Sequence, residues 1–572
     1  MHYWHKASFI LRKHFYFILK PMGTAKIITL INFKMEAFMK YFFKITAFVL
    51  IIAVSLNFAG CKKKQTESTE KQDSNQGGSD IGGRSFTMYI CSANAKVIEN
   101  LKWYKIAEQA VKIQVDYVQG PENLADYYES VDRMAAAKDL PDTLMVTLSQ
   151  ADAYGSQGLF LDLVPIIKKN APNMQKYIDA DPMYRSLVTS KDGSIYGLCA
   201  ETPIITEFIG YRADHFEKAG IDVNRLKTLD DFTQALRALK NYYGQENGSY
   251  HPLCGRDLVI RFAAWFDAAS NISINESNGI YVNGHFHEGS IDIMCEGAYD
   301  MVLTMKMWYD EGLIDPEWVK GNSDTADWEE KVLKGNGSVF YDVYDRADWF
   351  MKNGGPRFDQ DFQMAVMNFL QNKNGNTMKV TASSKYNTGF VTAINADCKE
   401  ETVQTIIQFL DFFYNEEGIT LSNYGMEKES FKKSNDGTNV FIVDYAVEEA
   451  KPEGVLRWSF PSDIFTVCKP VDMPAFFKWN SPLIAEAAAR LMTEDSLMTS
   501  YVLKLSDPQT EELSGLVDKV YDAEMTGLTE FIIGERELNA GEWKSFLEEI
   551  NSLGLSRIEE IQLEAYQNTY KQ

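Results

Sequence analysis

The chain lacks the residue patterns of several common kinds of chemistry. Its 572 residues include seven cysteines, and no two of these form a Cys-x-x-Cys pair, which leaves zinc binding and thioredoxin-like chemistry without support. No glycine is followed by Lys-Ser or Lys-Thr, so a phosphate-binding P-loop is absent. The segment Gly155–Gly158 (GSQG) lacks the Gly-x-Ser-x-Gly spacing of a nucleophile elbow.

An excess of positive charge is missing as well. The whole sequence carries a net charge of −23. Residues 1–60 contain eight Lys and Arg against one acid, a net of +7, so the remaining residues carry −23 − 7 = −30. A surface this acidic disfavours binding to nucleic acid or to another anionic polymer through bulk attraction.

The apolar run Ile45–Phe58, about 14 residues long, is too short to span a bilayer comfortably as a permanent helix. A basic segment, Met39–Lys44, precedes it, and small residues lead into Cys61, which is typical of a bacterial export signal. The letters FAGC ending at Cys61 resemble the lipobox of lipoproteins. We predict that residues 1–60 are a signal peptide with an over-extended N-terminus and that Cys61 is lipidated.

Residues 62–83 (KKKQTESTEKQDSNQGGSDIGG) are polar, rich in glycine and serine, and free of aromatic residues. Such a segment cannot bury enough apolar surface to order itself. We predict a lipidated flexible tether over 61–83, with its leading lysines at an anionic membrane surface. The length of the chain that follows predicts two or more lobes with substantial cores.

The chain after the tether opens on alternating strand and helix patterns. We expect a strand, a helix, a half-buried strand, a helix and a buried strand over Ser85–Cys91, Asn94–Gln109, Lys112–Val118, Leu124–Ala137 and Thr143–Leu148. This order indicates a mainly parallel sheet covered by helices. Open sheets of this kind bind ligands at the carboxyl ends of their strands.

The stretch Lys191–Gly220 is the candidate connection between two lobes. It turns at an Asp-Gly pair, continues as an apolar, β-branched strand and then changes to helical spacing. We predict that Ile204–Gly210 passes between two sheets, beside a returning segment near Lys385–Ile394.

Several local signals predict later elements. Thr228 is the N-cap candidate of a helix that extends to Tyr243. The pair Asn283-Gly284 predicts a hairpin over 279–289. Further helices are expected over Glu296–Glu311, Glu400–Tyr414, Pro482–Leu503, Gln509–Gly527 and Ala540–Tyr570.

Six cysteines remain once Cys61 is assigned to a lipid: Cys91, Cys199, Cys254, Cys295, Cys398 and Cys468. Their wide spacing selects no disulfide connectivity. We favour buried free thiols and leave the disulfide state open.

Several sequence segments match one family in order and spacing. They are AAAKDLPDTL (135–144), GLFLDLVPIIKKNAPN (158–173), KDGSIYGL (191–198), YRADHFEKAGID (211–222), MWYDEGLIDPEW (307–318), SNYGMEKES (422–430) and the ending 530–567. Together they resemble extracellular solute-binding proteins of the family 1 type, in particular the long, LplA-like branch. The chain departs from the family at Cys199, where a proline often follows YGL, and at Glu427–Glu429, where the family is richer in glycine.

The resemblance implies a two-lobed α/β fold of the type II periplasmic-binding-protein kind, with a hinge, an interlobe cleft and a helix-rich C-terminal third. We assign 84–206 and 386–457 to lobe 1, and 207–385 and 458–572 to lobe 2. The resemblance further implies a monomeric, lipid-anchored ABC-importer receptor outside the cytoplasm, with permease subunits and an ATPase as partners. Its expected ligand is a carbohydrate, with an oligosaccharide as the usual case. No cofactor, metal or nucleic acid is expected.

Sugar rings offer an apolar face to aromatic side chains and hydroxyl groups to carboxylates, amides and guanidinium groups. The densest cluster of such residues follows the strand pattern at 338–340, where a binding loop would emerge. We predict ligand contacts from Tyr344, Asp345, Arg346, Trp349, Glu201, Trp265, Tyr104, Trp458 and Trp479. For each of them, core packing or a surface position is an equal alternative.

Other functions stay open. His285 and His287 lie on one face of a strand and could bind a metal, although a solvated loop is the favoured interpretation. The many acidic residues could supply the carboxylate pair of a glycan-degrading surface enzyme. A peptide or other non-sugar ligand, and a structural or adhesive role, are the remaining alternatives.

Overall fold

The computed structural model describes residues 84–91, 102–275, 279–285, 290–320, 325–372, 375, 377–442, 468–478, 480–493, 497–498 and 501–570. Every element described below lies within Gly78–Gln572. The predicted signal peptide, the tether, Cys61, Trp458 and Trp479 lie outside the described residues.

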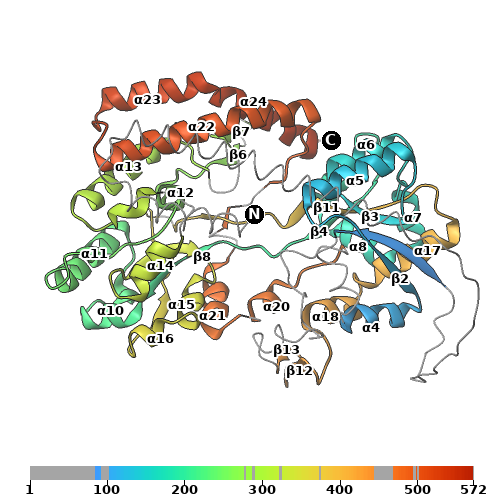
Figure 1. Ribbon diagram of the computed structural model, residues 1–572, viewed down its shortest axis with the longest axis horizontal. Helices are drawn as coiled ribbons and strands as arrows, with labels where there is room; N and C mark the ends of the chain where they lie inside the picture. Colours follow the sequence, from blue (N-terminus) through green and yellow to red (C-terminus); the bar gives the residue numbers. More distant parts are fainter. Residues whose placement is uncertain are drawn as a thin grey trace, which may run out of the picture. The chain divides into compact units, whose positions relative to one another are not determined.

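The first sheet contains five strands in the order β2-β1-β3-β11-β4 (Figure 1). Their bounds are β1 Ser85–Ile90, β2 Gln114–Gln119, β3 Thr143–Val146, β4 Leu198–Glu201 and β11 Tyr386–Ile394. Strands β1, β2 and β3 are parallel, whereas β11 is antiparallel to both β3 and β4. The predicted β-α-β-α-β opening is therefore confirmed, and β4 points in the same direction as β1, β2 and β3.

Helices surround this sheet to form the first lobe. They are α4 Lys102–Val111, α5 Leu124–Ala137, α6 Leu148–Ser156, α7 Val164–Asn170, α8 Pro172–Ala180, α9 Pro182–Val188, α17 Glu400–Phe412 and α18 Glu416–Tyr424. Local chemistry fixes where several of them begin. Asn123 accepts a hydrogen bond from the backbone N–H of Ala125 at 2.8 Å, and Thr147 forms a capping box with Gln150 at the start of α6.

The second sheet is smaller and antiparallel, in the order β8-β5-β9. Its strands are β5 Glu207–Arg212, β8 Val339–Val343 and β9 Met364–Val366. The helices of this second lobe are α10 Ala213–Lys218, η1 Val223–Arg225, α11 Leu229–Tyr243, α12 Leu258–Ala263, η2 Ala264–Phe266, α13 Glu296–Asp310, η3 Pro316–Lys320, α14 Thr325–Leu333, α15 Arg346–Lys352, α16 Gly355–Phe358, α20 Met473–Lys478 and α21 Pro482–Leu491. Thr228 caps α11 as predicted, in a capping box with Asp231.

Three long helices form a layer at the end of the chain, coloured orange to red in Figure 1. They are α22 Asp507–Ile533, α23 Ala540–Leu553 and α24 Leu555–Tyr570. Helix α22 packs against α13, and α24 packs against β7. The predicted helix-rich ending is confirmed, but two of its expected helices are wrong in extent. The helix expected over Ala540–Tyr570 is two helices, separated by Gly554 with a φ of 119°. The helix expected over Pro482–Leu503 ends at Leu491, and Leu497–Met498 form a strand.

Three two-stranded ribbons complete the described part of the chain: β6 Asn271–Asn275 with β7 Gly279–Asn283, β10 Val380–Thr381 with β14 Leu497–Met498, and β12 Phe431–Lys433 with β13 Asn439–Phe441. Strand β7 pairs with the preceding strand β6, a pairing that the sequence did not predict. The second arm of the predicted hairpin over 279–289 lies outside the described residues from 286 to 289.

Separate hydrophobic cores support the two lobes. Phe86, Tyr127 and Phe409 belong to the core of the first lobe, and Trp308 belongs to the largest core of the second. Cys468 packs in the core of the first lobe, where its Sγ lies 2.7 Å from the backbone oxygen of Leu198. Cys468 therefore belongs to the first lobe, although the sequence predicts that the second lobe begins at residue 458.

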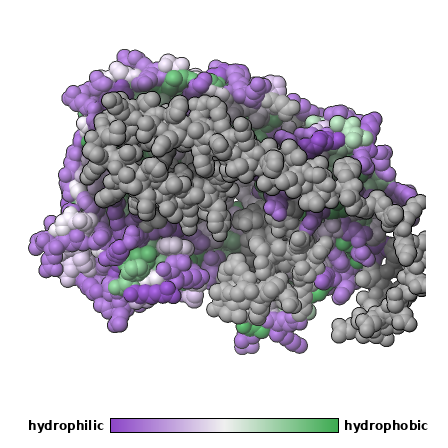
Figure 2. All heavy atoms as spheres, in the orientation of Figure 1, coloured by the Kyte–Doolittle hydropathy of each residue, from purple (hydrophilic) through white to green (hydrophobic). Residues whose placement is uncertain are grey.

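The thiols of Cys199, Cys254, Cys295, Cys398 and Cys468 are free, as favoured from the sequence. Across the residues that the structure describes, no helix combines the length and the apolar composition needed to cross a bilayer. The described surface visible in Figure 2 is mostly hydrophilic, with small apolar patches. This agrees with the strongly acidic composition of the chain.

Two glycines in helices test how tightly the second lobe is packed. A Cβ atom at Gly297, near the start of α13, would lie 1.8 Å from the backbone oxygen of Phe266, whereas a Cβ at Gly515 in α22 meets nothing within 4 Å. We expect Gly297→Ala to lower the free energy of unfolding by about 1–3 kcal/mol through overpacking. Gly515→Ala should raise it by up to about 1 kcal/mol because alanine favours the helix. Urea unfolding of both variants checks this, and equal effects would contradict it.

Candidate functional site

The chain passes from the first sheet to the second between Glu201, at the end of β4, and Glu207, at the start of β5. It returns from the second lobe to the first before Tyr386, where β11 begins. The two passages lie side by side: the N–H of Thr202 donates to the backbone oxygen of Lys385 at 2.8 Å, and the N–H of Ser383 donates to that of Ile205 at 2.8 Å. We call 202–206 the outward passage and 382–385 the return passage.

The predicted connection is therefore observed, but it is shorter and earlier than expected. The sequence placed it at Ile204–Gly210 beside Lys385–Ile394. Residues from 207 onward already pair within β5, and residues from 386 onward already pair within β11.

The strand directions define which edge of the first sheet adjoins the outward passage. Strands β1, β2, β3 and β4 run the same way, so their carboxyl ends share the edge from which the chain leaves at Glu201. Loops at the carboxyl ends of such strands are the usual ligand-binding loops of an open α/β sheet.

The second sheet presents the end of β8 to the same passage. Val343, the last residue of β8, is paired with Glu207, and the N–H of Tyr344 donates to the backbone oxygen of Thr206 at 3.1 Å. The predicted cluster of Tyr344, Asp345, Arg346 and Trp349 therefore emerges beside the outward passage. The cluster lies there because β8 pairs antiparallel with β5. The sequence prediction relied instead on the rule that ligands bind at the carboxyl ends of parallel strands.

A buried carboxylate, Asp342, organises the charged groups of this cluster. It is fully buried, and Arg256 contacts it with two nitrogens at 3.0 and 3.1 Å. Nitrogens of Arg261 and Arg346 each lie 3.8 Å from Asp342 Oδ1. Burial would raise the pKa of Asp342, but the guanidinium groups of Arg261 and Arg256 hold it below its ordinary value.

The same guanidinium groups have further carboxylate partners. Arg346 donates to Glu329 at 2.5 Å, and Arg261 donates to Glu207. Burial raises the pKa of Glu207 to about 7, although Arg261 opposes the shift. Each of the three guanidinium groups thus lies beside at least one carboxylate, so the positive charges of the cluster are locally balanced.

Aromatic rings lie next to these charges. The guanidinium carbon of Arg346 is 5.3 Å from the ring centre of Trp349 and 5.9 Å from that of Trp328. Tyr344 and Trp349 are partly exposed, and Asp345 is exposed. Within the described residues, Arg346 Nε and Trp328 Nε1 are buried without a hydrogen-bond partner. The arrangement offers rings, carboxylates and N–H donors together, which is the chemistry that polyhydroxylated ligands require.

Sequence reasoning missed Arg256, Arg261, Glu207, Glu329 and Trp328. They lie on four separate elements or loops, and no spacing in the sequence connects them. The one available signal was the position of Glu207 at the expected lobe connection.

Two predicted ligand residues lie in cores. Tyr104 is 1% exposed and its ring is 5.8 Å from that of Phe409, while Trp265 is 2% exposed and its ring is 4.8 Å from that of Phe262. Both rings are enclosed by other side chains, so these two residues pack in cores, which was the alternative to ligand contact. Trp458 and Trp479, which are also predicted to contact the ligand, lie outside the described residues.

Glu201 is also buried, at 6% exposure, but among polar groups. Its Oε2 accepts a hydrogen bond from the N–H of Val471 at 2.7 Å, and its Oε1 lies 3.1 Å from Lys385 Nζ and accepts a hydrogen bond from Tyr177. Both oxygens of this carboxylate therefore contact groups of the protein itself, in place of the contact with ligand that the sequence predicts.

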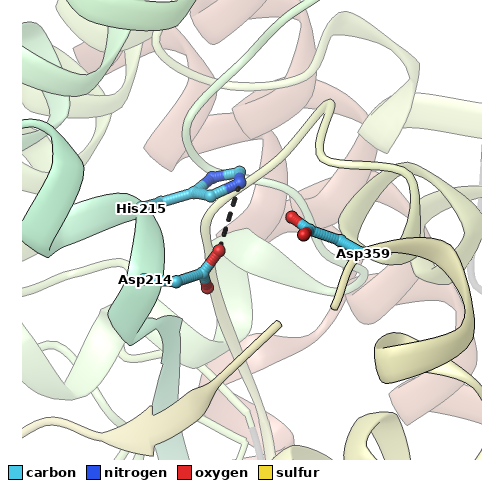
Figure 3. A group of neighbouring side chains, drawn as sticks. All are labelled: Asp214, His215 and Asp359. Carbon is cyan, nitrogen blue, oxygen red and sulfur yellow. Dashed lines mark ion pairs between the residues drawn. The ribbon is translucent and has the colours of Figure 1, made fainter. Parts of the chain in front are cut away.

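Asp214, His215 and Asp359 converge at the other end of β5, and their side chains point toward one another (Figure 3). Although these three groups could hold a metal ion, Arg212 Nη2 lies 2.7 Å from Asp214 and 2.9 Å from Asp359. A guanidinium group therefore already supplies the positive charge that a metal would bring. The cluster is best explained as an ion-pair network that secures the junction between β5 and α10.

His285 differs from the favoured interpretation of a solvated loop. It is fully buried, and its Nε2 forms a hydrogen bond with Glu524 of α22. His287, the second residue of the metal-binding hypothesis, lies outside the described residues.

Two sheets, each with its own core and helices and joined by paired passages, define a two-lobed solute-binding fold of the type II periplasmic kind. The sequence model for the bacterial extracellular solute-binding protein family matches residues 102–423, more than half of the chain. The chain belongs to this family.

Individual relatives are more distant. Lipoprotein LipO of Bacillus subtilis (strain 168) is 23% identical over 325 residues, which cover 54% of this chain and 60% of LipO. The arabinooligosaccharide-binding protein of the same organism is 23% identical over 316 residues, 49% of this chain and 68% of that protein. The chain thus spans less than two thirds of LipO.

A solved extracellular solute-binding protein from Bifidobacterium longum subsp. infantis superposes with a TM-score of 0.62 at 14% identity. The superposition covers 86% of this chain and 99% of that one. At this identity the likeness concerns the fold, and it agrees with the two-lobed arrangement described above.

The pKa of His215 predicts a pH dependence of stability. Burial, followed by the charge of Arg212, lowers this pKa to about 4, well below the ordinary value near 6.5. Between these values the unfolded chain binds the proton more readily, so stability falls as the pH decreases from about 6.5 toward 4.

We expect His215→Gln to remove part of this loss, on the order of 1–2 kcal/mol between pH 6.5 and 5. Urea unfolding of both proteins at pH 7.5, 6 and 5 measures it. Equal slopes of stability against pH in the wild type and the variant would contradict the assignment.

Proposed function

We propose that this protein is the lipid-anchored receptor of an ABC importer and that it captures a carbohydrate between its lobes without chemically changing it. The observation that carries the proposal is the cluster after β8, where partly exposed Tyr344 and Trp349 lie beside a network of guanidinium and carboxylate groups. Membership of the solute-binding family and the arabinooligosaccharide-binding relative support the choice of an oligosaccharide.

The proposed mechanism is closure of the lobes about the outward and return passages. A ligand that contacts both lobes only when they are closed has a higher affinity for that state and so shifts the population toward it. In this proposal the first lobe contributes the loops at the carboxyl ends of β1–β4, and the second lobe contributes the cluster at Tyr344. The closed state is then the one recognised by the proposed permease subunits, with their ATPase.

Charge balance in the cluster favours a neutral sugar. Arg256, Arg261 and Arg346 each lie beside a carboxylate, and the chain after residue 60 carries a net charge of −30 from the counts above. A uronic acid would have to compete with these carboxylates and approach against an unfavourable field.

A thermal-shift screen of the soluble form that begins at Arg84 tests the function. We expect neutral oligosaccharides to raise the melting temperature, because a ligand that binds only the folded state stabilises it. Uronic-acid oligomers and peptides serve as the competing ligands. If no sugar raises the melting temperature, the carbohydrate proposal fails, and release of reducing ends during incubation would favour a glycan-degrading enzyme.

Trp349→Ala tests the location of the site. We expect the dissociation constant of a sugar found in the screen to rise about 3- to 10-fold through loss of ring contact, measured by calorimetry. Tyr242→Ala is the control, because Tyr242 is an exposed aromatic residue near the end of α11, outside the cluster. Unchanged affinity in the Trp349 variant would refute this site while leaving the sugar function in place.

A further inference from the structure

Within the residues that the structure describes, three segments carry the chain between the lobes. The outward passage and the return passage are two of them. The third runs from Cys468, in the core of the first lobe, to α20, whose Phe476 and Phe477 pack in a core of the second lobe. We call 468–472 the third passage.

A single carboxylate links the three passages. Glu201 directly precedes the outward passage, Lys385 ends the return passage, and Val471 lies in the third passage. The two oxygens of Glu201 bind the ammonium group of Lys385 at 3.1 Å and the N–H of Val471 at 2.7 Å. Tyr177 of α8 adds a hydrogen bond from the first lobe. Glu201 thus connects three segments that are far apart in the sequence.

Neighbouring groups hold these partners in place. Lys385 also lies 3.3 Å from Asp181 Oδ2 and 5.1 Å from the ring centre of Tyr386, and the Tyr386 hydroxyl donates to Asp181. The third passage is attached to the first lobe a second time, because Asn423 donates to the backbone oxygen of Pro470 at 3.1 Å and accepts from the N–H of Asp472 at 2.9 Å. The passages therefore have limited freedom to slide past one another.

The chemistry of this point requires a carboxylate. An ammonium group, a backbone N–H and a hydroxyl group all donate to Glu201, and a carboxylate accepts on both oxygens. A glutamine has only one oxygen, so its amide N–H₂ would face a donor, and a buried donor without an acceptor is unfavourable.

We propose that Glu201 is the positioning residue that couples the three passages, so that the lobes move as rigid bodies and the closed state forms at low entropic cost. Glu201 has this effect without touching the ligand. Its influence on ligand affinity rests on the proposed function, whereas its influence on lobe motion does not. A looser connection would broaden the range of lobe orientations and increase the ordering that ligand binding has to impose.

Glu201→Gln and Lys385→Met test the proposal from both sides of the ion pair. Lys385 is partly exposed, at 37% of its side chain, so we expect its variant to fold even if the buried Glu201 change prevents folding. Asp411→Asn is the matched control. Asp411 is a buried carboxylate that accepts from the N–H of Met174 at 2.8 Å and from Asn173 at 2.7 Å, entirely within the first lobe.

Lobe motion is measured without ligand by single-molecule energy transfer between dyes on cysteines introduced at two exposed positions, Lys169 in the first lobe and Arg225 in the second. The partly exposed Cys295 and Cys398 are replaced by serine in every protein compared. We expect a broader distance distribution for Glu201→Gln and Lys385→Met, and an unchanged one for Asp411→Asn even where its melting temperature falls.

The affinity for a sugar that binds the wild type should fall about tenfold in the two passage variants, within the usual range of coupling between sites, and stay unchanged in Asp411→Asn. Wild-type distributions in both passage variants would overturn the proposal. A broadened distribution with unchanged affinity would overturn the link to binding. If no sugar binds even the wild type, the proposed function fails, but the distance measurement still decides the role of Glu201.

Discussion

The pairing of two short backbone segments is the constraint on which the rest of the structure depends. Residues 202–206 and 382–385 are far apart in the sequence, yet hydrogen bonds hold them side by side between the two sheets. These bonds satisfy several N–H and C=O groups of the two segments outside any sheet, so the chain can leave one core and enter another along a hydrogen-bonded path. The third passage joins this pair through the buried carboxylate of Glu201.

This constraint also locates the candidate site. The outward passage begins at the edge of the first sheet where parallel strands end and enters the second sheet beside the end of β8. The Tyr344 cluster therefore lies at the junction, and Asp342, buried among three guanidinium groups, fixes the orientation of its charged side chains. Buried charges of this kind persist only when they are paired, and the pairing gives the site a defined shape before any ligand arrives.

Much of the local structure was predictable because short-range chemistry decides it. The alternating pattern of the first strands, the cap at Thr228 and the helix-rich ending were all legible in the sequence. The pairing of β7 with the strand before it was not predicted, because no turn signal as clear as Asn283-Gly284 stands between the two strands. For the candidate site, the sequence pointed to the cluster after β8. It did not distinguish exposed from buried residues among the aromatic side chains predicted to contact the ligand.

The sequence by itself determined the alternating strands and helices at the start of the first sheet, the export-signal and tether patterns, the acidic charge and the family resemblance, since all of these depend on composition and on neighbours along the chain. Only the tertiary structure decided that Tyr104 and Trp265 belong to cores, that Glu201 contacts other passages, and that Arg256 and Arg261 reach Asp342. Burial and ion pairing depend on which distant segments meet, and no spacing within one segment encodes that meeting.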